Sequence, residues 1–197
     1  MRSYKKISIS IAIIIFLSLG MINIFFSPDD NKILIRDVVI SNKNNLSFVS
    51  FNQEIILDYL IREAIDKGIP LVFKLTLRVV EKDDIWPTKI IKREVRYYQI
   101  EYKALRKIYK VEDVNGKHFE YKNMDEAIQK ILKVDDLEFM IYNPSSQSVI
   151  DSRMLYQLWL NVSLERKKLP KPIQVNYFDR TWHMKSEKSI HNLGELN

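Results

Sequence analysis

Apolar and polar residues alternate along much of the chain after residue 32, the pattern of strands with one buried face. In Leu71–Val79 every second side chain is apolar, and Lys74, Thr76 and Arg78 point to the opposite side. Met154–Leu164 repeats the pattern. The other expected strands are Ile33–Ile40, Leu46–Phe51, Lys92–Tyr102, Ile108–Val114, Lys117–Tyr121 and Leu137–Tyr142.

Two helices are expected between the strands. Asn52 can cap a helix over residues 53–67, because its side chain can accept from the free N–H groups of the first turn. Gly68 then supplies the left-handed residue that ends many helices. Asn123 likewise precedes an amphipathic helix over residues 124–133.

The pair Asn115-Gly116 predicts a two-residue hairpin turn. The segment Leu169–Pro172 is expected to be extended, because its two prolines fix φ and remove backbone donors. A mainly β chain with two helices favours a two-layer β-sandwich that follows one N-terminal transmembrane helix. We assign this sandwich to residues 33–186 and a polar C-terminal tail to residues 187–197.

The segment Ile7–Phe26 contains twenty residues without a charge. At about 1.5 Å per residue, such a helix spans the roughly 30 Å hydrocarbon core of a bilayer. We therefore expect residues 1–27 to form a cytoplasmic basic tip and a transmembrane signal-anchor helix, followed by a linker over residues 28–32. A cleaved signal peptide is the alternative, because Ser18-Leu19-Gly20 resembles a cleavage site.

The charges that flank this segment predict its orientation. Arg2, Lys5 and Lys6 precede it, whereas Asp29 and Asp30 follow it. Positive flanks stay in the cytoplasm, so the body is expected in the periplasm and the protein in the inner membrane as a single-pass chain. Under the alternative, the cleaved body is soluble in the periplasm.

The net charge of +6 owes half its value to Arg2, Lys5 and Lys6. The remaining 28 basic residues face 25 acidic ones, a surplus too small to predict binding to nucleic acid. The chain has no cysteine, which excludes disulfides, thiol catalysis and thiolate metal sites.

No grouping of residues predicts catalysis, a cofactor or a metal. The three histidines are isolated in sequence, and the three Asp-Asp pairs lack the spacing of a calcium loop. Four glycines leave no nucleophile elbow or phosphate-binding loop. We therefore expect no enzyme, no catalytic or cofactor-binding residue and no bound metal. The residues considered and set aside are His118, His183, His191, Asp29-Asp30, Asp83-Asp84 and Asp135-Asp136.

Residues 89–110 carry a basic stripe of eight Lys and Arg residues against two glutamates, Glu94 and Glu101. Near a bilayer such a stripe can contact anionic head groups or an acidic partner. It is equally typical of a solvated outer sheet face with lysines that protect an edge. The stripe comprises Lys89, Lys92, Arg93, Arg96, Lys103, Arg106, Lys107 and Lys110.

Three segments, Ala64–Leu77, Tyr97–Val111 and Leu169–Val175, together with Trp182 and Ser186, resemble a known family. It is the proteobacterial domain of unknown function 4390 family. The resemblance implies an exported or membrane-anchored protein of Gram-negative bacteria, often encoded beside a sensor histidine kinase pair. It implies no activity and no site residue.

These observations lead to ordered expectations of function. The first is an uncharacterised envelope protein, a non-enzymatic tethered binding module that acts with another envelope protein such as a sensor kinase. The alternative is a carrier or sensor of an apolar small molecule or lipid. An enzyme of a new type comes third.

Overall fold

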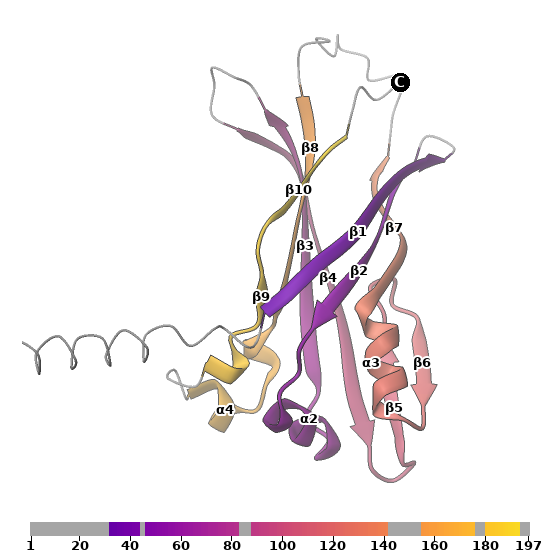
Figure 1. Ribbon diagram of the computed structural model, residues 1–197, viewed down its shortest axis with the longest axis vertical. Coiled ribbons are helices and arrows are strands. Elements are labelled where there is room, and N and C mark those ends of the chain that lie inside the picture. The colour runs from indigo at the N-terminus through magenta and orange to yellow at the C-terminus, as the bar shows by residue number, and fades with distance from the viewer. Residues whose placement is uncertain (1–31, 44–45, 83–87, 142–154, 176–179, 194–197) are drawn as a thin grey trace, which may run out of the picture. The chain divides into compact units, whose positions relative to one another are not determined.

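A computed structural model describes residues 32–43, 46–82, 88–141, 155–175 and 180–193 (Figure 1). The expected membrane segment Ile7–Phe26 and the linker up to residue 31 lie outside these ranges. Within them, no helix has both the length and the hydropathy of a membrane span. All of the described residues belong to one compact unit, Asn31–Asn197.

The described strands form one ten-stranded sheet in the order β6-β5-β4-β3-β8-β9-β1-β2-β7, with β10 also paired to β8. The sheet is open and curled (Figure 1). Its strands are β1 (Lys32–Lys43), β2 (Leu46–Ile55), β3 (Leu71–Lys82), β4 (Lys89–Lys103), β5 (Ile108–Glu112), β6 (His118–Tyr121), β7 (Lys133–Ile141), β8 (Leu155–Leu164), β9 (Lys185–Ser186) and β10 (Ser189–Asn192).

The mainly β class is confirmed, but the two-layer sandwich is wrong. Strand β8 pairs with β3 along its whole length, and β9 pairs with both β8 and β1. Hydrogen bonding therefore runs through β9 from one half of the sheet to the other, and the halves are not separate layers. Strand β10 also brings part of the expected polar tail into the sheet.

The first helix begins later than expected, so the predicted cap at Asn52 is wrong. Strand β2 continues to Ile55, because Phe51 and Gln53 are buried and the strand stays paired with β1. Helix α2 (Tyr59–Asp66) is capped by Asp58, whose Oδ1 accepts from the N–H of Ile61 at 2.9 Å. It ends before Gly68, which has a φ of 79° as predicted.

The second helix is confirmed as α3 (Met124–Leu132), with Asn123 Oδ1 accepting from the N–H of Asp125 at 2.7 Å. A third helix, α4 (Lys171–Val175), replaces the expected extended segment. Proline fits the first turn of a helix, because N–H groups there have no partner within the helix. Two short 3₁₀ helices, η2 (Arg166–Lys168) and η3 (Arg180–Trp182), complete the described helices.

The hairpin between β5 and β6 is confirmed, but its turn is longer than two residues. The N–H of Asp113 donates to the carbonyl of Lys117 at 2.9 Å, which closes a loop around both ends. The Asp113 carboxylate accepts from the N–H groups of Asn115 and Lys117, each at 2.9 Å. Only Gly116 has a positive φ in this loop, so the predicted turn type is wrong.

The core lies on the concave face of the sheet. Helix α3 contacts β5 and β6 near one edge and β2 and β7 at the other, so it fills the opening of the curl. One buried hydrogen bond crosses this interior, from the Tyr98 hydroxyl to Gln53 Oε1 at 2.6 Å. The largest fully buried side chains include Phe73, Tyr98, Phe139, Ile33, Ile61, Leu75 and Leu77.

Candidate functional site

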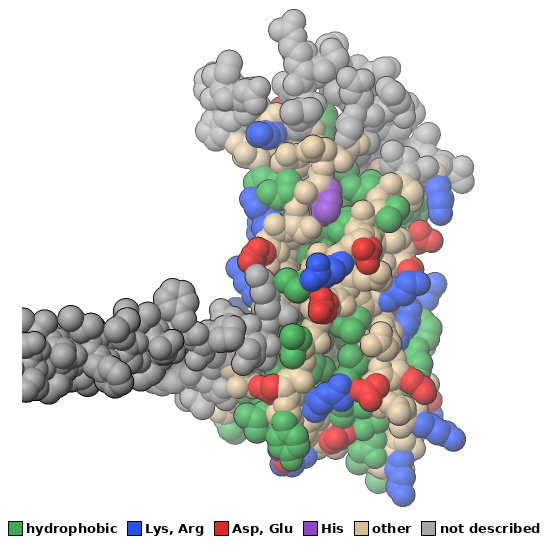
Figure 2. All heavy atoms as spheres, viewed as in Figure 1, with side chains coloured by type: hydrophobic (Ala, Val, Ile, Leu, Met, Phe, Trp, Pro, Cys, Tyr) green, Lys and Arg blue, Asp and Glu red, His purple; other side chains and the backbone are tan. Residues whose placement is uncertain are grey.

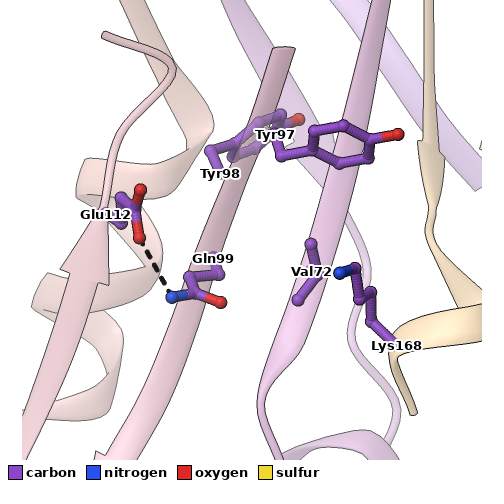
Figure 3. A pocket seen from close by; sticks show the side chains of 6 residues that line it. All are labelled: Val72, Tyr97, Tyr98, Gln99, Glu112 and Lys168. Atoms are coloured by element: carbon purple, nitrogen blue, oxygen red, sulfur yellow. Dashed lines mark hydrogen bonds between the residues drawn. The ribbon is translucent and has the colours of Figure 1, made fainter. Parts of the chain in front are cut away.

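The best-defined candidate site is a hollow on the outer face of β3 and β4, the face turned away from the core (Figure 3). Its volume is about 320 Å³. Strand register explains its composition, because Val72 pairs with Gln99 and Gln99 pairs with Glu112. We call it the outer-face hollow, and its lining residues are Val72, Tyr97, Tyr98, Gln99, Glu112 and Lys168.

Polar groups surround an apolar floor in this hollow. On one side, Gln99 Nε2 donates to Glu112 Oε2 at 3.0 Å, and on the other, Lys168 reaches in from η2 (Figure 3). The start of η2 is held against β3, because the N–H of Glu165 donates to the Val72 carbonyl at 2.7 Å. The hollow therefore offers a carboxylate, an amide and an ammonium group on a hydrogen-bonded frame.

Tyr97 forms the rim of the hollow and is half exposed, at 50%. Its neighbour Tyr98 points its ring into the core, because successive side chains of a strand point to opposite faces. An exposed aromatic ring beside hydrogen-bonding groups suits the binding of a polar side chain or peptide group.

A second hollow lies between α2 and the start of α3. It is wide open, with a volume of about 550 Å³. Arg62 bridges the two helices through Asp125 at 2.9 Å, and the Tyr109 hydroxyl donates to Asp66 Oδ1 at 2.5 Å. Its lining residues are Tyr59, Arg62, Glu63, Asp66, Tyr109, Lys122, Asn123 and Met124.

Burial, followed by the hydrogen bond to Asp66, raises the pKa of Tyr109 to about 12. In the unfolded chain a tyrosine titrates near 10, so between about pH 10 and about pH 12 the folded state keeps a proton that the unfolded state loses. The stabilising contribution of Tyr109 is present below about pH 10 and declines as pH rises toward about 12.

We therefore expect the free energy of unfolding to fall between about pH 9 and about pH 11, and to fall less in Tyr109→Phe. Denaturant unfolding at both pH values measures this change. Tyr59→Phe, which removes a phenol from the same hollow, is the matched control. The same decline in the wild type and in Tyr109→Phe would contradict the assignment.

The basic stripe does not form one surface. Lys92 and Arg96 both pair with Glu94 on the core-side face of β4, whereas Arg93 lies on the outer face opposite Arg78. Lys103 and Arg106 flank the β4–β5 turn and pair with Glu101 and Glu120, respectively. Most of its charges are thus already paired with acidic neighbours.

The histidines remain apart in the structure. His118 is exposed on β6, His183 contacts Arg166, and His191 on β10 has its Nε2 2.6 Å from Ser189 Oγ. Burial lowers the pKa of His191. Among the described residues, no group of three or more His, Asp or Glu side chains could hold a metal ion. Asp135 and Asp136 lie on β7, and the other two aspartate pairs lie outside the described ranges.

Sequence reasoning did not identify the outer-face hollow. Gln99 and Glu112 become neighbours only through the register of β4 and β5, and Lys168 arrives from a distant 3₁₀ helix. The one sequence feature that could have marked the site is Tyr97. It lies next to Tyr98 in an alternating strand, so one of the two rings had to face away from the core.

Residues that carry the family resemblance serve the fold. Trp182 is buried in the core, and Ser186 Oγ accepts from the N–H of Val162 at 2.9 Å. Asn161 Nδ2 donates to the Ser186 carbonyl at 2.7 Å, which ties β9 to β8. These contacts hold the strand that joins the two halves of the sheet.

Comparison with known proteins identifies the family but no function. Neither a curated protein nor a solved structure matches the chain. The family model described as domain of unknown function (DUF4390) matches residues 30–191, which cover all the described strands except the last residue of β10. The chain therefore belongs to the DUF4390 family.

Proposed function

We propose that this chain is a non-enzymatic envelope protein, a binding module tethered by Ile7–Phe26 that acts with another envelope protein such as a sensor kinase. In this proposal the N-terminus is cytoplasmic and the body periplasmic. If the N-terminal helix is cleaved, the same module acts as a soluble periplasmic protein. The outer-face hollow is its partner site.

The observation that carries this proposal is the half-exposed Tyr97 at the rim of a polar hollow. Tyrosine is enriched at the energetic centres of protein interfaces, because its rigid ring buries much area at little entropic cost. The backbone beneath it belongs to paired strands, so the site needs little ordering when a partner binds.

The charges of the hollow support a polar protein partner. Glu112 can accept from a basic or amide group, while Lys168 can donate to an acidic one. The alternative function, a carrier of an apolar ligand, needs an apolar space. In the described part of the chain the concave face is filled by core side chains, so we give the carrier second place.

In-cell photocrosslinking tests the proposal. A photoreactive amino acid at position 97 of the full chain is expected to capture one reproducible envelope protein, which mass spectrometry can identify. The matched control is the same probe at Val39, which is exposed at 60% on β1.

Substitution of the hollow supplies the second arm of the test. We expect Glu112→Gln with Lys168→Gln to reduce capture at position 97, because both charged contacts are removed. Capture of no protein at position 97, or of the same protein from positions 97 and 39 alike, would contradict the proposal.

A further inference from the structure

Large apolar side chains are exposed at one end of the body. Ile56, Tyr59 and Leu60 flank the start of α2 with exposures of 62%, 75% and 53%. Leu105, in the turn between β4 and β5, is fully exposed at 103%. Figure 1 shows α2 and this turn at the same end of the sheet, the lower one in that view. We call these four residues the apolar end.

The two parts of the apolar end are fixed to one another. The Tyr109 hydroxyl on β5 donates to Asp66 at the end of α2, and Gly68 lies against the carbonyl of Tyr102 on β4. Helix α2 buries Ile61 and Ile65 on its core side, so its exposed apolar residues form a separate surface. Exposed apolar side chains that gather in this way mark an interaction surface.

Basic residues surround the apolar tip of the β4–β5 turn. Lys103 and Arg106 flank Leu105, and Lys107 follows. The pairs that Lys103 and Arg106 make with Glu101 and Glu120 reduce the local surplus of charge. An apolar residue ringed by Lys and Arg suits the membrane interface, where the chains of these residues reach toward phosphate groups.

The N-terminal connection brings the expected membrane segment close to this end. Ile33 pairs with Ile55, so β1 begins beside the strand end that leads directly to Ile56 and α2. The linker over residues 28–32 reaches at most about 17 Å when fully extended. An anchor at Ile7–Phe26 would thus keep this part of the body near the bilayer surface.

We propose that the apolar end rests on the phospholipid interface of the membrane that holds Ile7–Phe26. Tyr59 lies at head-group depth, as aromatic residues at membrane interfaces do, and Leu60 and Leu105 reach the outer part of the acyl region. This inference rests on the tether in the proposed function. It adds that the body binds the bilayer with a defined end.

The absence of cysteine allows a direct test. Single-cysteine variants Tyr59→Cys, Leu105→Cys and Val39→Cys of the full chain are labelled with an environment-sensitive fluorophore. They are then reconstituted into vesicles that contain anionic phospholipid. Lipids that carry a quencher near the head group are expected to reduce the emission of labels at positions 59 and 105. A label at position 39 is expected to lose emission only to a water-soluble quencher.

Circular dichroism of each labelled variant confirms that the fold is retained. Labels at 59 and 105 that behave like the label at 39 overturn the proposal, as does shielding from both quenchers, which would indicate a protein partner or a second copy. Failure of the chain to float with vesicles overturns the tether and this inference together. Capture at position 97 without lipid quenching at 59 would leave the binding module standing and remove only the membrane contact.

Discussion

Replacing Phe73 with alanine is expected to lower the free energy of unfolding by about 3–5 kcal/mol, the largest effect we expect from one substitution. Phe73 is 1% exposed in the middle of the sheet, where β3 lies between β4 and β8. Its ring stacks on Tyr98 with centroids 5.4 Å apart. Alanine would therefore remove both the buried area and an aromatic pair, and paired strands on both sides hinder collapse of the cavity.

Denaturant unfolding of the full chain in mild detergent, followed by far-ultraviolet circular dichroism, measures this loss. Leu105→Ala is the control, because it removes an apolar side chain that is fully exposed, and its effect should stay within about 0.5 kcal/mol. Similar losses in the two variants would show that Phe73 does not lie in the core.

The second large effect is expected from Tyr98→Phe, at about 1–3 kcal/mol. The Tyr98 hydroxyl donates to Gln53 Oε1 at 2.6 Å in the interior, and Gln53 is only 5% exposed. Phenylalanine would leave the buried carbonyl oxygen of Gln53 without its donor. Within the described residues, Gln53 Nε2 already has no hydrogen-bond partner, so the variant would bury a wholly unsatisfied amide.

A double variant separates this hydrogen bond from packing. Adding Gln53→Leu to Tyr98→Phe replaces both partners with apolar groups, and we expect it to recover most of the lost stability. The same unfolding experiment applies to the two single variants and the double variant. Losses that simply add would contradict a direct interaction between the two side chains.

Strands were predictable because their pattern is local. Burial of alternate residues in β3 and β8 follows directly from which side chains are apolar, and both strands were found where expected. The same holds for α3, whose cap and apolar stripe are close together in sequence. Strand β2 shows the limit, because a capping residue at position 52 could not reveal that pairing with β1 extends to Ile55.

The sheet's curl could not be predicted from alternation. A strand that buries one face reads the same whether its partner is a second layer or the far side of its own sheet. The decision depended on β9, a two-residue strand that pairs with both β8 and β1. A strand this short has no period to detect.

The candidate surfaces depended on tertiary structure for the same reason. Tyr97 was visible as an aromatic residue, but its polar neighbours Glu112 and Lys168 come from other elements. The basic stripe was visible as a run of charge, yet alternation and bulges divide it between two faces. Charge counted along a strand therefore does not predict charge on a surface.

By itself, the sequence determined the mainly β class, the positions of most strands, the end of α2 at Gly68 and the family. Each of these follows from local spacing or from residues read in order. Only the tertiary structure decided that the strands make one curled sheet, that α4 replaces an extended segment, and that the outer-face hollow and the apolar end exist. These features depend on register, short bridging strands and packing between distant segments, none of which has a local signature.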